Sequence, residues 1–305
     1  MAESLLNQTR RLLHRFDLKT RKSLAQHLLV DEEALELSLE AAELTLSDIV
    51  LEVGPGLGVL TRELAKRAGR VVAIELDDKL AALLKQALAS CSNVVVINED
   101  ILKIDPEALL REQTPNLPQT ITSPSRYKVV ANLPYYITSA VLRHFLEAPV
   151  KPQMMVVMVQ KEVAQAIVAE PGRMSVLSIS VQLYGKPGII GYVPAASFYP
   201  APEVDSAILR IDLYPEPAVA VDEKSFFKLV RAGFTASRKQ IGNSLAQGLG
   251  VSKAEVLPLL EKTNIEAKRR AETLTLDEWA RLWRAYIGES EHADNSSASQ
   301  DKPDS

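Results

Sequence analysis

Short apolar runs and longer amphipathic stretches alternate along the first two thirds of the chain. Runs rich in β-branched residues predict buried strands, and apolar residues spaced three or four apart predict helices. The predicted strands are 49–53, 71–75, 94–97, 127–131 and 154–159, and the predicted helices are 31–46, 57–68, 77–89, 139–147, 161–169 and 174–184. This alternation is typical of an α/β fold with a Rossmann-like, doubly wound, mostly parallel sheet.

The pattern changes towards the C-terminus. Two further strands are predicted at 189–193 and 207–213, and the Pro-containing segment 214–217 indicates a linker. Residues 222–288 show helical periodicity alone, which predicts a smaller all-helical domain. The expected organisation is a basic N-terminal arm at 1–30, a sheet domain at 31–214, a helical domain at 215–288 and a disordered tail at 289–305.

The predicted strand 127–131 ends in Asn132-Leu133-Pro134-Tyr135. The carboxyl edge of a parallel sheet is where ligands bind, so these groups would face a ligand. The side-chain oxygen of Asn132 and a backbone carbonyl, that of Leu133, would accept both hydrogens of an exocyclic nucleobase amine. Pro134 would fix the turn, and Tyr135 would offer a flat face to a flipped base. The four residues would equally suit a strand-ending turn with a buried tyrosine, and alone they leave both interpretations open.

A glycine-rich turn follows the first predicted strand, with glycines at 54, 56 and 58. Such a turn binds a dinucleotide, a methyl donor or nothing, and its spacing differs from the G-x-G-x-x-G of nicotinamide enzymes. Glu75 ends the next strand, where a carboxylate would accept ribose hydroxyls. Asp100 follows the third strand, where it would meet an adenine amino group. Each acid alone would also serve as a helix cap, but together they favour a nucleoside-containing ligand.

Composition narrows the class of protein. The 305 residues carry a net charge of -4, a single cysteine and four histidines, so an internal disulfide and a metal-site spacing are both excluded. We expect a soluble cytoplasmic protein, because no membrane-spanning run and no secretory signal are found. Basic residues nevertheless cluster in three places, at 10–22, 231–239 and 262–270. Clusters of this kind are either solvated faces or sites for phosphate.

Together these motifs resemble the class I S-adenosylmethionine-dependent methyltransferases, and specifically the KsgA-type small-subunit ribosomal RNA adenine dimethyltransferases. The resemblance runs from about residue 22 to about residue 245. Its markers are Ser23-Leu24-Ala25-Gln26-His27-Leu28-Leu29, Glu52-Val53-Gly54-Pro55-Gly56-Leu57-Gly58, Glu75, Asp100, Asn132-Leu133-Pro134-Tyr135, the segment 197–206 around Phe198, and the segment 234–240.

The resemblance implies a function and a set of site residues. The family dimethylates N6 of two neighbouring adenosines in the 3′-terminal hairpin of small-subunit RNA, with S-adenosylmethionine as donor. Residues 31–214 would then be the donor-binding catalytic domain and 215–288 the RNA-contacting domain. Tyr135 and Phe198 would sandwich the flipped adenine. The donor pocket would be lined by His27, Leu29, Gly54, Glu75, Asp100 and Asn132.

The resemblance also implies the partners, small-subunit rRNA and the immature small ribosomal subunit, and no membrane. A monomer is expected, since the sequence shows no sign of obligate oligomerisation. His27 departs from the family, which often has asparagine there. Three alternatives remain open: a large-subunit methyltransferase of the erythromycin-resistance type, a non-catalytic ribosome-assembly or transcription factor, and, disfavoured by the glycine spacing, a nicotinamide oxidoreductase.

Overall fold

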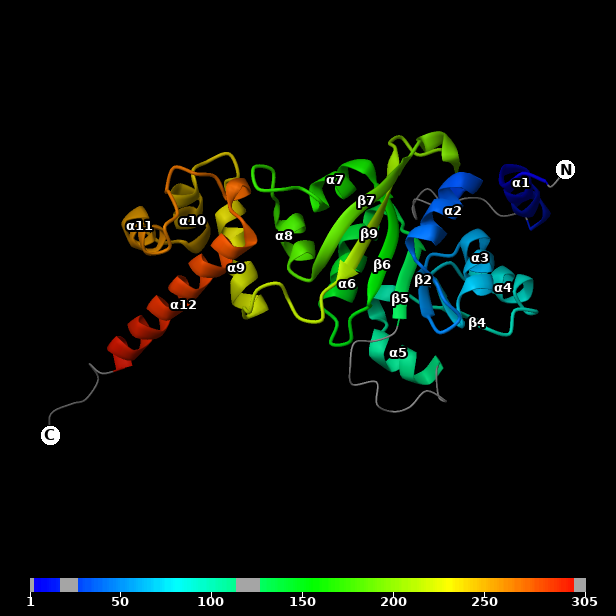
Figure 1. The fold of residues 1–305 in the computed structure, drawn as a ribbon, viewed down its shortest axis with the longest axis horizontal. Helices are drawn as coiled ribbons and strands as arrows, with labels where there is room; N and C mark the ends of the chain where they lie inside the picture. The colour runs from blue at the N-terminus through cyan, green and yellow to red at the C-terminus, as the bar shows by residue number, and fades with distance from the viewer. Residues whose placement is uncertain (1–2, 17–26, 114–126, 299–305) are drawn as a thin grey trace. The chain divides into compact units, whose positions relative to one another are not determined.

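The computed structural model describes residues 3–16, 27–113 and 127–298. The chain divides into two compact units (Figure 1). One comprises Met1–Val168 and Tyr184–Glu216, and the other comprises Ala169–Leu183 and Pro217–Ser305. The predicted linker at 214–217 spans the last crossing between them. The first unit contains the sheet, and the second is helical.

A seven-stranded sheet forms the centre of the first unit, in the order β4-β3-β2-β5-β6-β9-β7. Its strands are β2 (Ile49–Val53), β3 (Arg70–Glu75), β4 (Val94–Asn98), β5 (Tyr127–Asn132), β6 (Met154–Gln160), β7 (Gly185–Val193) and β9 (Ser206–Leu213). Strands β4, β3, β2, β5 and β6 are parallel to one another, and β9 is antiparallel to both β6 and β7. The predicted mostly parallel α/β sheet is therefore confirmed.

Helices lie before, between and after the parallel strands of the first unit. They are α1 (Leu5–Arg15), α2 (Glu32–Ala41), α3 (Val59–Arg67), α4 (Asp78–Ala87), α5 (Pro106–Gln113), α6 (Thr138–Leu146) and α7 (Lys161–Ile167), with short 3-10 turns η2 (Ile101–Lys103), η3 (Tyr135–Ile137) and η4 (Ala195–Ser197). From β2 the chain proceeds outward through β3 to β4, and from β5 it proceeds the other way to β6. Right-handed crossovers then place the two sets of helices on opposite faces and create a switch point between β2 and β5.

A buried cluster on one face joins the sheet to α2 and α3. Val50, Val130 and Val156 come from neighbouring strands, and they pack with leucines of both helices such as Leu35 and Leu64. These valines lie on the central strands β2, β5 and β6, so this face of the sheet is anchored where the switch point lies. Packing of this kind fixes the strand ends on which a site is built.

A buried lysine anchors β5, the strand that leads to Asn132. Lys128 is 4% exposed, and its Nζ donates to the carbonyl oxygens of Ala42 (3.0 Å) and Glu43 (2.8 Å) and to Oδ2 of Asp48 (3.1 Å). Three acceptors satisfy the three donors of an ammonium, which is what makes its burial tolerable. The end of α2 is thereby tied to the strand that positions the candidate site.

A small ribbon of two short strands lies apart from the main sheet. Strand β1 (Leu28–Leu29) pairs antiparallel with β8 (Phe198–Tyr199), in the register Leu28 to Tyr199 and Leu29 to Phe198. The sequence did not predict this pairing, because two-residue strands carry no periodicity. The ribbon brings two segments of the family resemblance, far apart in the chain, side by side.

The second unit comprises α8 (Val176–Gln182), α9 (Glu223–Phe234), α10 (Ile241–Leu249), α11 (Lys253–Lys262), η5 (Ala271–Thr273) and α12 (Leu276–Ala298). Its centre is Trp279, which is fully buried and stacks with Phe234 at a ring-centroid distance of 5.9 Å. Helix α8 contacts α9 within this unit, although the sequence-based organisation places its residues in the 31–214 domain.

Three segments differ from, or extend, what the sequence predicts. Helix α12 continues to Ala298, so residues 289–298, predicted to be a disordered tail, are helical; extending a helix that already exists needs no new nucleation. The arm 1–30 contains the helix α1. The insertion predicted at 105–126 begins with α5, and its remainder lies outside the described residues, as do 17–26 and 299–305.

In the part of the chain that is described, no helix is both long and apolar enough to cross a membrane.

Candidate active site

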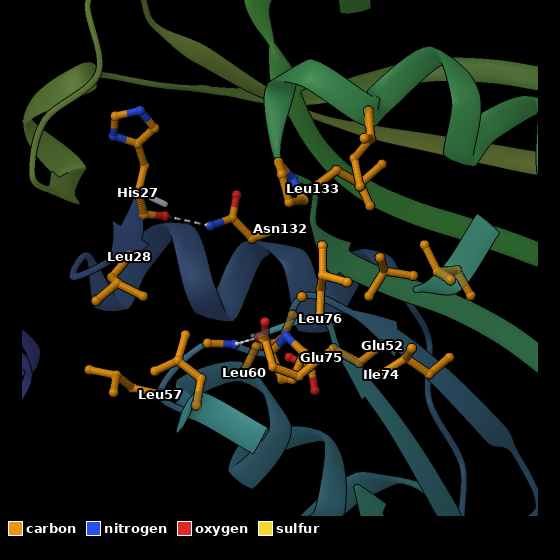
Figure 2. Close-up of a pocket in the computed structure, with 18 of the residues that line it drawn as sticks. His27, Leu28, Glu52, Leu57, Leu60, Ile74, Glu75, Leu76, Asn132 and Leu133 are labelled. Atoms are coloured by element: carbon orange, nitrogen blue, oxygen red, sulfur yellow. Dashed lines mark hydrogen bonds between the residues drawn. The ribbon is translucent and has the colours of Figure 1, made fainter. Parts of the chain in front are cut away.

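A cavity of about 220 Å³ opens at the carboxyl ends of β2, β3, β4 and β5, at the switch point of the sheet. Figure 2 shows its lining, with Asn132 and His27 on one side and Glu75 on the other. Of the predicted site residues, it is lined by His27, Leu29, Gly54, Glu75, Asp100, Asn132, Leu133, Pro134 and Tyr135. The structure thus brings the glycine turn, both acids and the Asn-Leu-Pro-Tyr motif to one place.

The glycine turn forms the floor of the cavity. Gly54, Gly56 and Gly58 have φ angles of 68°, 56° and 75°, a region that residues with a Cβ rarely adopt. A Cβ on Gly58 would lie 2.4 Å from Cδ1 of Leu84, and one on Gly56 would lie 3.0 Å from Cδ2 of Leu28. Glycine is therefore required for the backbone to turn here, and it keeps the space above the turn open to a ligand.

Glu75 is held beside this turn by backbone amides. Its Oε2 accepts from the N–H of Gly56 at 3.0 Å, and its Oε1 accepts from the N–H of Asp77 at 2.9 Å. The side chain is nearly buried, and this burial raises the pKa of the carboxyl above its usual value. Each oxygen uses one lone pair in these bonds and keeps another for a ligand. A paired hydroxyl donor, such as a ribose edge, fits this arrangement.

Asp100 caps a short turn and also lines the cavity. Its Oδ1 accepts from the N–H of Leu102 at 3.0 Å, so it caps the 3-10 turn η2. It also lines the cavity, on the strand end next to that of Glu75. A carboxylate in this place can accept a hydrogen bond from a ligand amine while it holds its own loop.

The sequence analysis gave no role to Glu52, the last charged residue before the glycine turn. It lines the cavity, is 1% exposed, and its Oε2 has no hydrogen-bond partner within the described part of the chain. Burial, reinforced by the nearby charge of Glu75, raises the pKa of Glu52 to about 8. The available signal was a carboxylate inside an otherwise apolar strand, a residue type that is rarely fully buried unless it is paired.

Asn132 faces the cavity from the end of β5. Its Nδ2 donates to the main-chain carbonyl of His27 at 3.1 Å, a bond drawn in Figure 2. That bond fixes which way the amide points, so Oδ1 is the atom presented as an acceptor. Among the described residues nothing donates to Oδ1. An amide oxygen held in this way suits the amine hydrogen of an incoming base.

Tyr135 lies in the 3-10 turn η3, and two contacts hold its side chain, one at the phenol oxygen and one on the ring. The phenol oxygen lies 2.6 Å from Oγ of Ser206, and burial raises the pKa of the phenol, which keeps it neutral. The ring stacks with the imidazole of His27 at a centroid distance of 5.6 Å and an interplanar angle of 25°. A rigid aromatic ring at the mouth of a cavity is a stacking platform for a base.

Phe198 is the one predicted site residue that the structure leaves outside this cavity. It is 3% exposed, and it packs in the same buried cluster as Leu29, opposite which it pairs in the β1–β8 ribbon. Its side chain therefore packs in the core cluster, next to a residue that does line the cavity. The sandwich of a flipped adenine between Tyr135 and Phe198 stays a prediction.

Three large apolar side chains on the cavity lining were not predicted. Leu76, Leu102 and Tyr136 are 46%, 38% and 52% exposed. Exposed apolar groups around a cavity commonly contact a ligand. Each follows, directly or by two positions, a residue that the sequence did single out, namely Glu75, Asp100 and Tyr135. Their position after those residues was the signal that could have identified them.

Comparisons with known proteins agree with this geometry. The family model for ribosomal RNA adenine dimethylase matches residues 17–282. The ribosomal RNA small subunit methyltransferase A of Dehalococcoides mccartyi (strain ATCC BAA-2266 / KCTC 15142 / 195) is 51% identical, over 93% of this chain and 94% of the relative. That of Alkaliphilus metalliredigens is 40% identical, over 90% of this chain and 95% of the relative.

Solved structures give the same picture. The 23S rRNA methyltransferase ErmE is 30% identical, with a TM-score of 0.64 over 85% of this chain and 98% of that chain. A dimethyladenosine transferase from Plasmodium falciparum has a TM-score of 0.72 over 87% of this chain and 98% of that chain; at 24% identity its likeness shows the fold alone.

Proposed function

The chain belongs to the ribosomal RNA adenine dimethylase family, and from this premise we propose that it dimethylates N6 of two adjacent adenosines in the 3′-terminal hairpin of small-subunit (16S) rRNA, with S-adenosylmethionine as donor. One observation carries the proposal. A single cavity joins a glycine turn and Glu75, which suit a nucleoside-containing donor, to Asn132 and Tyr135, which suit a flipped base. Donor and acceptor would therefore meet in one place.

The residues present fit the donor. Glu75 would accept the ribose hydroxyls and Asp100 the adenine amino group, and the open backbone at Gly54 would border the methionine portion. Leu76 and Leu102, which are exposed on the lining, would cover the adenine faces. When bound, S-adenosylmethionine supplies a methyl group that its cationic sulfur already activates.

The protein's own contribution is to position the amine. Oδ1 of Asn132 and the backbone carbonyl of Leu133 would accept the two amine hydrogens, which localises the nitrogen lone pair and favours the positive charge that develops there. Tyr135 would hold the base by stacking. Because the donor carries the activation, no strongly basic side chain is needed, and the product proton can leave to solvent.

RNA would be gripped outside the cavity. Arg10, Arg11 and Arg15 lie on the exposed side of α1, while Leu12 and Leu13 of the same helix pack against the cavity-lining Leu57, Leu80 and Leu28. In the helical unit, Arg231, Arg238 and Lys239 are exposed. Arg269 is not available in the same way, because it pairs with Glu278. Contacts of this type read RNA backbone and shape.

The substrate would be an immature small ribosomal subunit in the cytoplasm, approached by a monomer. A second candidate is methylation of large-subunit RNA, which the 30% identity to the 23S rRNA methyltransferase ErmE favours. The small-subunit assignment is better supported, because relatives that carry that name reach 51% identity over nearly the whole chain.

The test is transfer of labelled methyl from S-adenosylmethionine to small subunits that lack the modification, followed by mapping of the labelled base. Dimethyladenosine in the 3′-terminal hairpin is the expected result. Label on large-subunit RNA alone would move the assignment to the second candidate. No label on either RNA, with donor binding intact by calorimetry, would point to a non-catalytic assembly factor.

A further inference from the structure

The imidazole of His27 makes its contacts on the target-base side of the cavity. Its ring stacks on Tyr135, and its Nδ1 lies 2.8 Å from the carbonyl oxygen of Pro200, to which it donates. Figure 2 shows the imidazole on the Asn132 side, pointing away from Glu75. The family resemblance places this position in the donor pocket, but the side-chain contacts belong to the platform for the base.

Main chain and side chain at position 27 have separate tasks. The carbonyl oxygen of His27 accepts from Nδ2 of Asn132, which any residue at this position would do equally well. The imidazole alone makes the contacts to Tyr135 and Pro200. Substitutions of the side chain therefore test the ring contacts while the hydrogen bond that orients Asn132 is retained.

The ring also limits how a base can reach Tyr135. The imidazole lies against one face of Tyr135 in a displaced stack, with the ring centroids 5.6 Å apart, and the phenol is held by Ser206. A stacked base must then use the opposite face, and Tyr135 has little freedom to tilt away from it. Aromatic pairs at such separations hold one another in offset-stacked or tilted geometries.

Resting on the proposed function, we propose that His27 is a positioning residue for the target adenine: its imidazole backs the ring of Tyr135 and ties it to the Pro200 segment, so that the base stacks on one defined face. The link to Pro200 matters because that segment continues from the β1–β8 ribbon, which holds the main chain next to His27.

Four proteins test this inference: the wild type, His27→Ala, His27→Asn and His27→Phe. Phenylalanine keeps a ring that can stack and loses the bond to Pro200, whereas asparagine keeps polarity and loses the ring. Each is measured for the thermal midpoint, for the donor Kd by calorimetry, for kcat and KM with small subunits, and for the fluorescence of 2-aminopurine placed at the target adenine.

For His27→Ala and His27→Asn we expect a donor Kd within about threefold of wild type, a kcat lowered about tenfold at saturating donor, as for the loss of an aromatic pair, and a weaker fluorescence change on flipping. His27→Phe should recover kcat and the fluorescence change in part, because it restores the stacking ring but not the bond to Pro200. A tenfold weaker donor Kd with unchanged kcat would overturn the inference and return His27 to the donor. If His27→Phe gives no higher kcat than His27→Ala, in a protein with a wild-type thermal midpoint, the inference is also overturned.

The same measurements separate this inference from the proposed function. If the wild type itself methylates no adenosine, the proposed function fails. If the wild type is active and the three variants behave as it does, only the role of His27 is removed.

Discussion

The N–H of Gly56 donates to Oε2 of Glu75 across 3.0 Å, so one carboxylate both fixes the glycine turn and faces the cavity. Removing Glu75 would therefore loosen the glycine turn and would also delete a group that faces the ligand. A substitution that separates the two effects is therefore needed.

Glu75→Ala should weaken donor binding by about 1.5–3 kcal/mol, which is the range for removal of a hydrogen bond to a charged group. Glu75→Gln keeps an oxygen for the Gly56 amide and should weaken binding less. Calorimetry with S-adenosylmethionine measures both. Glu40→Ala, which removes an exposed carboxylate that does not line the cavity, is the control and should bind donor as the wild type does. Equal affinities for Glu75→Ala and wild type would exclude Glu75 from the donor site.

Asn132→Ala should lower kcat by about 100-fold or more, the cost of removing a polar group that stabilises charge only in the transition state. Donor affinity should change little, because the role of Asn132 is at the amine. Single-turnover methyl transfer and calorimetry separate the two quantities. Turnover like that of the wild type would contradict the assignment.

Reversal of Arg10, Arg11 and Arg15 to glutamate should weaken RNA binding and reduce the slope of log K against log salt by about 0.7–0.9 for each phosphate that the arm no longer neutralises. Binding titrations at several salt concentrations measure this slope. Reversal of Lys66, Lys79 and Lys85, three exposed lysines of the same unit, is the charge-matched control. If the control changes the slope as much, α1 has no particular part in RNA binding.

Glu52 should make the unfolding free energy depend on pH. Its folded pKa of about 8 lies above the ordinary value of 4.5, so the folded protein holds a proton that the unfolded chain releases in this window. The stability that this proton provides is complete below the unfolded pKa and is lost as pH rises through the folded pKa, at up to about 1.4 kcal/mol per pH unit.

Urea unfolding of Glu52→Gln and wild type, from about pH 5 to about pH 9, spans the window in which the two states hold different numbers of protons. The variant should gain stability relative to the wild type as pH rises, because its amide has no proton to release. A constant difference across the series would mean that Glu52 does not titrate there.

Gly58→Ala should destabilise the fold more than Gly250→Ala. The two glycines have φ angles of 75° and 72°, so the backbone strain of a Cβ is matched. Only at Gly58 does a Cβ meet a neighbour, Cδ1 of Leu84 at 2.4 Å, whereas nothing lies within 4 Å at Gly250. We expect about 1–2 kcal/mol of strain at both sites and a further destabilisation at Gly58 from the clash. Equal unfolding free energies for the two variants would show that Leu84 moves aside without cost.

Much of the fold could be predicted because its central strands β2, β3, β5 and β6 are buried on both faces and form apolar runs in the sequence. Strand ends then follow, and with them the places of Glu75, Asp100 and Asn132. Lys128 interrupts such a run, and only the structure shows the three acceptors that make it part of the core. Local pattern could not show that α8 belongs to the helical unit, because that depends on its contact with α9, far along the chain.

For the site, too, positions along the chain could be predicted, but contacts between distant segments could not. Residues at strand ends were identified from spacing, whereas the direction of a side chain depends on pairing with distant segments. Phe198 packs in the core where β8 pairs with β1, and His27 stacks on Tyr135, a residue more than 100 positions away in the chain. Glu52 carried a signal in its residue type, but that its Oε2 has no hydrogen-bond partner among the described residues is a property of the packed structure alone.

Helix α8 belongs to the helical unit but lies in the sequence between two parts of the sheet unit. This order affects how the two units can be produced as separate proteins. A protein ended after residue 214 would keep α8 but lose α9, so the surface of α8 that packs against α9 would be left in water. Such a fragment is expected to self-associate through that apolar face. The sheet unit cannot be obtained by a single cut; residues 169–183 would have to be replaced by a short polar connection as well.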